Sequence, residues 1–196
     1  MKVKAGLLIA FEGLDQSGKQ TQAELLRDRL TSEGRTVRLL SFPDYQTTIG
    51  AVIGSALRGE RDYGADVMQL LYIANRYEWK PDIVRETDAG TIVVCDRYLA
   101  SSIAYGEAHG LDPSWLAEMQ RYLPQPDVTF LLDIAPDVSV RRKAHDRDKY
   151  ERDLALLARV RESYLRQAQA GWVRLDAGRD RHDVASDVYT EVRERL

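Results

Sequence analysis

The sequence contains few of the residues that build disulfides and metal clusters. Its 196 residues include one cysteine, Cys95, and three histidines, His109, His145 and His182. A single cysteine excludes an internal disulfide and a CxxC zinc site, and the scattered histidines have no metal-ligand spacing. The fold must therefore be held by a hydrophobic core, and we expect the protein to reside in the reducing cytoplasm.

Long apolar runs and an excess of positive charge are also missing. The first apolar run ends at Glu12, which is far too early for a membrane span or a signal peptide. The chain has 28 basic and 31 acidic residues, so its formal net charge is −3. This balance does not favour nucleic acid as a partner, and any anion-binding site must be local. We expect neither a membrane nor a nucleic-acid partner.

What the sequence does contain is a regular alternation of apolar strands and amphipathic helices. Such an alternation predicts a parallel sheet covered by helices on both faces, with the ligand beyond the carboxyl ends of the strands. The length fits a single α/β domain over residues 1–196. Strands are expected at 7–11, 36–42, 91–95, 128–133 and 172–175. Helices are expected at 18–30, 49–57, 66–79, from Pro81, at 99–109 and 113–123, from Pro136, and at 151–170 and 183–195.

A glycine-rich loop joins the first expected strand to the first expected helix. Residues 13–19 match GxxxxGK, in which backbone amides converge on phosphate oxygens at a helix amino end. Lys19 adds a point charge for the β- and γ-phosphates. The motif predicts a three-layer P-loop NTPase fold with a five-stranded sheet that binds ATP with Mg²⁺. The expected ATP-binding residues of this loop are Gly13, Leu14, Asp15, Gln16, Ser17, Gly18, Lys19, Gln20 and Thr21.

The residue after Lys19 departs from the usual motif. Gln20 stands where a Ser or Thr normally supplies a hydroxyl ligand to Mg²⁺, and Thr21 comes one position later. Either Gln20 offers a carbonyl oxygen, or the metal relies on carboxylates and water, which it accepts readily. Asp15 in the loop and Asp96 at the end of the third strand are the expected carboxylates. The predicted metal-binding residues are therefore Asp15, Asp96 and Gln20.

Several motifs in order resemble the thymidylate kinase family of P-loop nucleoside-monophosphate kinases. They are FEGLD at 11–15, FPDY at 42–45, ANRYE at 74–78, DRY at 96–98 with SSIAY at 101–105, and DKYE at 148–151. The resemblance covers nearly the whole chain. It implies transfer of the γ-phosphoryl group of MgATP to dTMP, which gives dTDP and ADP for dTTP synthesis. It also implies a homodimer formed through helices such as 66–79 and 99–109.

The same resemblance assigns the acceptor site. Tyr72 lies where the family stacks an aromatic ring on thymine, and Arg76, on the same helix face, would bind the carbonyl edge of the base. Arg97, whose guanidinium can grip a phosphate, and Tyr45 match positions that hold the acceptor phosphate. The expected dTMP-binding residues are Asp15, Phe42, Pro43, Tyr45, Tyr72, Arg76, Arg97, Ser101, Ser102 and Tyr105. Two positions differ from many members: Gly106 replaces a Gln, and Asp44 replaces a basic residue.

Residues 141–151 form the densest basic segment and are the expected lid. Bringing ATP and a nucleoside monophosphate together places about six negative charges close to one another, which cations must neutralise. A solvated helix end is the alternative interpretation. Because Gln16 follows Asp15 where some members carry a basic residue, the resemblance implies that lid residues act instead. The expected catalytic residues are Asp15, Lys19, Arg97, Arg147 and Lys149, with Arg142 near the adenine.

Other functions share parts of this pattern. A deoxynucleoside kinase would phosphorylate a sugar hydroxyl with a carboxylate base, for which Glu12 is available. A nucleotide-binding paralogue with impaired catalysis would account for Gln20. A GTPase-type switch is disfavoured because the sequence contains no Asn-Lys-x-Asp run.

Overall fold

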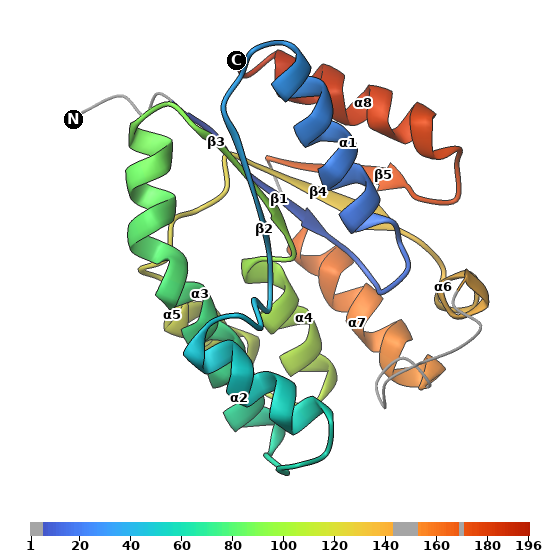
Figure 1. The fold of residues 1–196 in the computed structure, drawn as a ribbon. Coiled ribbons are helices and arrows are strands. Elements are labelled where there is room, and N and C mark those ends of the chain that lie inside the picture. Colours follow the sequence, from blue (N-terminus) through green and yellow to red (C-terminus); the bar gives the residue numbers. More distant parts are fainter. Residues whose placement is uncertain (1–5, 143–152, 169–170) are drawn as a thin grey trace.

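The computed structural model describes residues 6–142, 153–168 and 171–196, and is built around a five-stranded sheet (Figure 1). The strand order is β2-β3-β1-β4-β5, and every neighbouring pair is parallel. The strands are β1 (Leu8–Glu12), β2 (Val37–Ser41), β3 (Ile92–Asp96), β4 (Val128–Asp133) and β5 (Trp172–Asp176). They nearly coincide with the expected strands. The parallel order brings all five carboxyl ends to one edge of the sheet.

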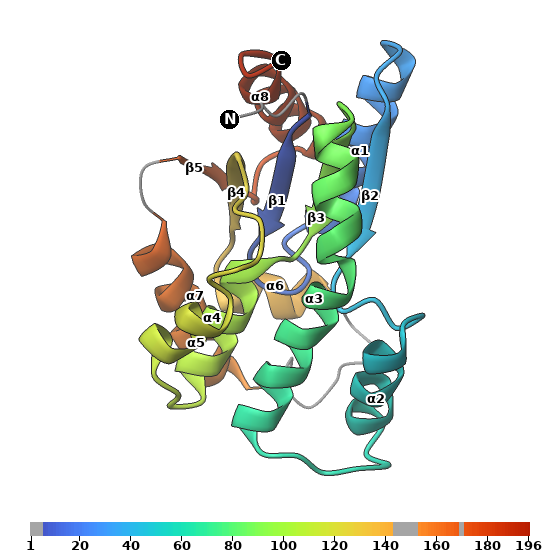
Figure 2. The same cartoon turned by 90° about the vertical axis from the view of Figure 1, so that its left-hand side faces the viewer.

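Helices cover both faces of this sheet. On one face lie α1 (Lys19–Ser32) and α8 (Arg181–Arg193), and on the other lie α3 (Ala65–Asp88), α4 (Leu99–Ala108) and α7 (Leu154–Gln167) (Figure 1). The turned view shows α2 (Thr48–Leu57) and α5 (Pro113–Met119) beyond the carboxyl ends of the strands, beside α3 and α4 (Figure 2). A short helix, α6 (Pro136–Arg142), follows β4. The expected three-layer P-loop NTPase fold is confirmed.

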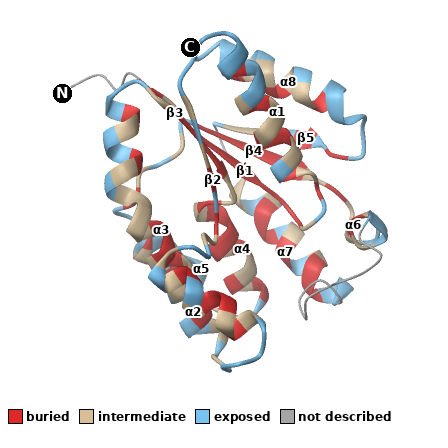
Figure 3. Ribbon diagram, in the orientation of Figure 1, coloured by how far each residue is buried: buried red, intermediate tan, exposed pale blue. Residues whose placement is uncertain are grey.

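The central strands are buried because every side chain of β1 meets a covering layer (Figure 3). Leu8 and Ala10 pack in one cluster with Ile83 of α3, whereas Ile9 and Phe11 belong to the cluster that contains Leu26 of α1. Alternating side chains of one strand thus serve opposite faces, as the pleat of a doubly covered strand requires. This packing fixes the end of β1, where the phosphate loop begins.

The helix break expected at Pro81 is wrong. One helix, α3, runs from Ala65 to Asp88 with Pro81 inside it. Proline has no N–H, so the carbonyl four residues earlier loses its helical partner. Ile83 and Thr87 beyond the proline are nevertheless buried, so packing against the sheet outweighs the local preference. Two other helices are shorter than expected, because α5 ends at Met119 and α7 spans Leu154–Gln167.

Within the described ranges, the longest helix is too polar to cross a membrane, and no other helix qualifies.

Candidate active site

The phosphate loop lies between β1 and α1, where the sequence predicts it. Gly13 and Gly18 have φ angles of 141° and 93°, which residues other than glycine rarely adopt. A Cβ atom at Gly13 would also lie 2.5 Å from the carbonyl oxygen of Leu132. Lys19 is buried at the start of α1, and its Nζ donates to the carbonyl of Leu14 at 2.8 Å. The Lys19 side chain therefore lies against the phosphate loop.

Helix α6 is attached to this loop by side chains. The Ser139 hydroxyl donates to the carbonyl of Asp15 at 2.6 Å. The Arg142 guanidinium donates to the carbonyls of Gln16 and Ala177, at 3.3 Å and 2.8 Å. Arg142 thus lies beside both the phosphate loop and the turn after β5. Sequence reasoning missed Ser139, which resembles any polar residue of a short helix.

The expected metal ligands differ in burial and in their hydrogen-bond partners. The Gln20 side chain is exposed, and its amide donates to Glu24 on the next turn of α1 at 2.9 Å. In contrast, Oδ1 of Asp96 and the hydroxyl of Ser17 are buried without a hydrogen-bond partner. Such oxygen atoms suit Mg²⁺, which usually keeps several waters and shares substrate phosphates. The described part of the chain contains no cluster of three His, Cys, Asp or Glu side chains that could hold a metal ion.

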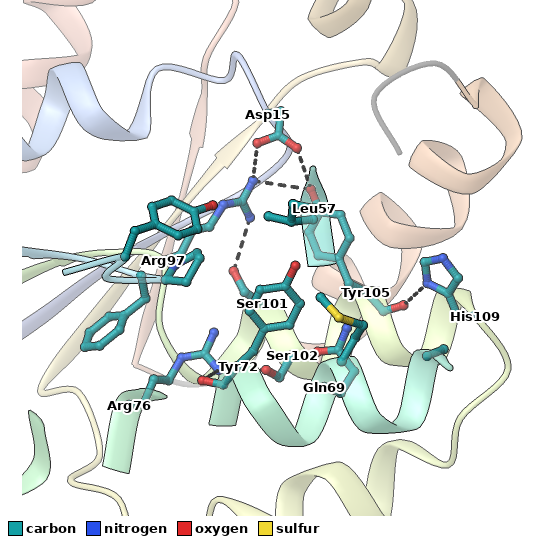
Figure 4. A pocket seen from close by; sticks show the side chains of 15 residues that line it. Asp15, Leu57, Gln69, Tyr72, Arg76, Arg97, Ser101, Ser102, Tyr105 and His109 are labelled. Carbon is teal, nitrogen blue, oxygen red and sulfur yellow. Dashed lines mark hydrogen bonds and ion pairs between the residues drawn. The ribbon is translucent and has the colours of Figure 1, made fainter. Parts of the chain in front are cut away.

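Arg97 occupies the centre of the site, directly after β3. Its backbone has a φ of 63°, a value that residues other than glycine rarely adopt. The guanidinium pairs with the Asp15 carboxylate at 2.5 Å and contacts the Ser101 and Tyr105 hydroxyls at 3.2 Å and 3.3 Å (Figure 4). The Tyr105 hydroxyl also donates to Asp15 at 2.9 Å. Arg97 therefore joins the phosphate loop to α4.

This cluster sets the charge of its members. Burial alone would raise the pKa of Asp15, but the charges of Arg97 and Lys19 and two hydrogen bonds bring that pKa well below its usual range. Burial opposes the charged form of Arg97, yet the neighbouring Asp15 carboxylate raises the pKa of the guanidinium. Burial also raises the pKa of the Tyr105 hydroxyl. Asp15 is thus an anion, Arg97 a cation and Tyr105 a neutral donor at physiological pH.

Glu12, at the end of β1, is an internal cap for α4. Its side chain is 0% exposed. Oε1 accepts from the backbone N–H groups of Tyr98, Ala100 and Ser101 at 2.9, 3.1 and 3.3 Å. Oε2 accepts from the Ser101 hydroxyl at 2.6 Å and from Tyr164 at 3.2 Å. These five donors satisfy the carboxylate and the first N–H groups of the helix at once.

All the expected dTMP-binding residues line one pocket between the phosphate loop, α3 and α4 (Figure 4). Within it, Arg76 of α3 is buried, and its Nη1 donates to the Ser102 hydroxyl of α4 at 2.6 Å. The Nε atom of Arg76 has no partner. Sequence reasoning missed further lining residues, which are Leu57, Ala65, Met68, Gln69 and His109. Gln69 could have been found, because it shares a helix face with Tyr72 and Arg76.

The ANRYE motif also positions the loop that carries Tyr45. Asn75 is buried, and its Oδ1 accepts from the N–H of Asp44 at 2.8 Å. Its Nδ2 donates to Thr47 at 2.7 Å, and the Thr47 hydroxyl donates to Glu78 at 2.5 Å. Asp44 turns to the Trp79 indole, which donates to it at 3.0 Å. The carboxylate that replaces a basic residue thus contacts α3 rather than lining the pocket.

Two predicted catalytic residues, Arg147 and Lys149, lie outside the described residues, as does most of the expected lid. The residues expected to bind dTMP lie together in the pocket, whereas Gln20 contacts Glu24. A phosphate loop that faces a pocket lined by Arg76 and Arg97 across the carboxyl edge of the sheet is the arrangement of a nucleoside-monophosphate kinase of the P-loop class.

Comparison with known proteins gives the family within this class. The thymidylate kinase family model matches residues 11–188, and the chain belongs to the thymidylate kinase family. It is 35% identical to the thymidylate kinase of Plasmodium falciparum, over 96% of this chain and 90% of that protein. Identity to the Schizosaccharomyces pombe thymidylate kinase is 34%, over 95% and 91% of the two chains. The solved thymidylate kinase of Candida albicans superposes with a TM-score of 0.86 at 28% identity, covering 97% of this chain and 92% of that one.

Burial gives Lys19 a pH dependence that can be measured. Burial, followed by repulsion from Arg97, lowers the pKa of Lys19 to about 8, although nearby carboxylates oppose the change. ATP affinity requires the charged form, so the affinity should decline as pH rises through about 8. The measurement is calorimetric ATP binding between pH 6.5 and 9.5. A Lys19→Arg variant, which stays protonated, should lack the decline, and a flat wild-type profile would contradict the prediction.

Proposed function

We propose that this chain transfers the γ-phosphoryl group of MgATP to dTMP, which gives dTDP and ADP. The observation that carries the proposal is the pocket itself, because all the expected dTMP-binding residues line it and one of them, Asp15, belongs to the phosphate loop. Family membership and the names of the relatives support the same reaction. The pocket offers Tyr72 and Arg76 to a flat base with carbonyl groups, and Arg97 to a phosphate.

The chemistry requires positioning and charge more than a base. The second pKa of a phosphate monoester is near 6, so the acceptor phosphate is already mostly a dianion at pH 7. We propose that Arg97 and Tyr45 hold this phosphate, and that Lys19 and the loop amides hold the phosphates of ATP in line with it. Lid residues Arg147 and Lys149 would supply further positive charge and exclude water, which prevents wasteful hydrolysis.

Mg²⁺ fits the oxygen atoms present. We propose that Asp15 and Asp96 hold the Mg²⁺ ion, directly or through water. We also propose that the side-chain carbonyl oxygen of Gln20 binds the ion once the Gln20 amide no longer donates to Glu24. The metal would neutralise charge on the ATP phosphates during transfer. Arg142, which ends α6 and donates to the carbonyl of Ala177 in the turn after β5, would pack near the adenine.

The deoxynucleoside kinase alternative needs a free carboxylate near a sugar hydroxyl. Glu12 is the acidic residue suggested for that role, but its two oxygens already accept five hydrogen bonds in the core. Asp15, the carboxylate that lines the pocket, is paired with Arg97. The arrangement favours a phosphate acceptor over a hydroxyl acceptor.

A coupled ADP-release assay across dTMP, dUMP, dCMP, dGMP, AMP and thymidine tests the proposal. We expect the highest kcat/KM with dTMP, weaker activity with dUMP and none with thymidine. Turnover of another monophosphate without turnover of dTMP would refute it. Turnover of thymidine would instead support the deoxynucleoside kinase alternative. Nucleotide binding without any turnover would support the impaired paralogue.

We also propose that residues 1–196 form a single kinase domain with a lid at about 141–151, and that the enzyme is a cytoplasmic homodimer. Val67, Leu70 and Val84 of α3 are exposed apolar residues, which supports an interface on this helix. Sedimentation equilibrium should therefore give twice the chain mass of 22.3 kDa. A Leu70→Glu variant should shift the protein to monomer, and a monomeric wild type would contradict the proposal.

A further inference from the structure

Gln69 is an unexplained polar group in the acceptor pocket. It lies on α3 and lines the pocket, yet its side chain is 5% exposed. Its carbonyl oxygen, Oε1, has no hydrogen-bond partner. A buried acceptor left unpaired costs free energy, so native structures nearly always satisfy such an atom by protein, water or ligand. A pocket residue with this deficit therefore indicates a ligand that carries a hydrogen-bond donor.

The surroundings of Gln69 place its amide beside the other polar groups of the pocket floor. Gln69, Tyr72 and Arg76 occupy one face of α3, at positions i, i+3 and i+7. Across the pocket, α4 presents Ser102, which accepts from Arg76, and Gly106 one turn later (Figure 4 shows Gln69, Arg76 and Ser102). Gln69 and Arg76 thus lie on either side of Tyr72 along this face of α3.

Gly106 makes room for this arrangement. A Cβ atom at Gly106 would lie 3.3 Å from Cγ of Gln69 and 2.4 Å from Cδ1 of Leu116. Its φ angle is that of an ordinary helix, so backbone strain does not explain the glycine. The close packing does, because a side chain here would first clash with Leu116 and would also press on Gln69. Gly106, Leu116 and Gln69 thus form one closely packed contact between α3, α4 and α5.

The chemistry of the proposed acceptor supplies the missing donor. Arginine donates and never accepts, so Arg76 suits a carbonyl oxygen of the base. Thymine joined to its sugar has one N–H donor, at N3, and this group lies between two carbonyls on the same ring edge. We propose that Oε1 of Gln69 accepts a hydrogen bond from the N3–H of the acceptor's base. Gln69 is then a further specificity residue, and this inference rests on the proposed function.

A methyl group on N3 provides a direct test. Dissociation constants for dTMP and 3-N-methyl-dTMP are measured by calorimetry, without ATP, on wild type and on Gln69→Met. We expect wild type to prefer dTMP by about 10- to 100-fold, the loss that follows when a buried polar group is left unpaired. In Gln69→Met, dTMP binding should weaken and the preference should fall toward one. Gln69→Glu keeps an acceptor oxygen and should keep most of the preference.

Gln120→Met is the matched control. Gln120 is also buried with an unpaired Oε1, but it lies at the end of α5, outside the pocket. Its variant should retain the wild-type preference. Because each preference is a ratio within one variant, partial unfolding lowers both affinities alike and cancels. An unchanged ratio in Gln69→Met would overturn the inference, whereas failure of wild type to bind dTMP would overturn the proposed function.

Discussion

Replacing Arg97 with alanine should lower kcat/KM for dTMP by at least about 10³-fold, the scale of an arginine that meets transferring phosphate charge. Among the described residues, the contacts of Arg97 explain the size of this loss. Arg97 is the cation that pairs with Asp15 and reaches Ser101 and Tyr105 together. Without Arg97, the pocket loses the guanidinium that could donate two hydrogen bonds to the acceptor phosphate. The Asp15 carboxylate, no longer paired, would then repel that phosphate. Both effects act on dTMP rather than on ATP.

Steady-state kinetics with varied dTMP and varied ATP will separate these contributions. Arg97→Lys keeps the positive charge but loses the planar pair of N–H donors. Its decrease in kcat/KM should therefore be smaller than that of Arg97→Ala. Arg161→Ala is a control, since Arg161 also pairs with an aspartate, Asp133, at 2.6 Å but does not line the pocket. Its kcat/KM should stay near that of wild type. An Arg97→Ala enzyme with less than a tenfold loss would remove Arg97 from the proposed phosphate site.

Replacing Glu12 with leucine should lower the free energy of unfolding by about 3–5 kcal/mol, the loss typical of breaking a buried charged network. The substitution leaves the first N–H groups of α4 and the Ser101 hydroxyl without their acceptor. Glu12→Gln keeps one carbonyl oxygen for the helix N–H groups and should lose less, about 1–2 kcal/mol. Urea denaturation followed by circular dichroism measures both values.

The same variants test whether Glu12 is a catalytic base. If Glu12 only caps α4, then Glu12→Gln should keep dTMP kinase activity within about tenfold of wild type, a smaller loss than the roughly 10²- to 10⁴-fold expected when a catalytic base is removed. A well-folded Glu12→Gln protein with a thousandfold lower rate on thymidine would instead support hydroxyl phosphorylation. The stability and activity measurements therefore answer separate questions about one residue.

The sequence was sufficient for the fold because apolar strands and glycine-rich turns act locally. The strands, the phosphate loop and the expected dTMP-binding residues of the acceptor pocket follow from pattern and resemblance, whereas the other lining residues of that pocket do not. Pro81 was misread because its local preference for a first helical turn is real, whereas the burial of Ile83 that overrides it is a long-range effect. The sequence pattern thus predicted whole strands and helices better than the role of a single residue within one of them.

Side-chain directions were beyond the sequence for a related reason. Glu12 and Gln20 sit at positions where either a ligand contact or a structural bond is possible. The fold decides between them by bringing the α4 amides to Glu12 and by leaving Gln20 beside Glu24. Gln69 was overlooked because a lone polar residue between Met68 and Leu70 resembles the solvent side of a helix. Its burial becomes visible when α4 packs opposite it.

The lone cysteine has a practical consequence for labelling experiments. Cys95 is fully buried in β3, and burial raises the pKa of its thiol, so it should not react with maleimides in the folded protein. A cysteine introduced at exposed Asp137 on α6, and a second at exposed Thr48 on α2, would then be the reactive thiols. A donor and an acceptor dye at these positions could report distance changes across the pocket during turnover, without removing any native residue from the core.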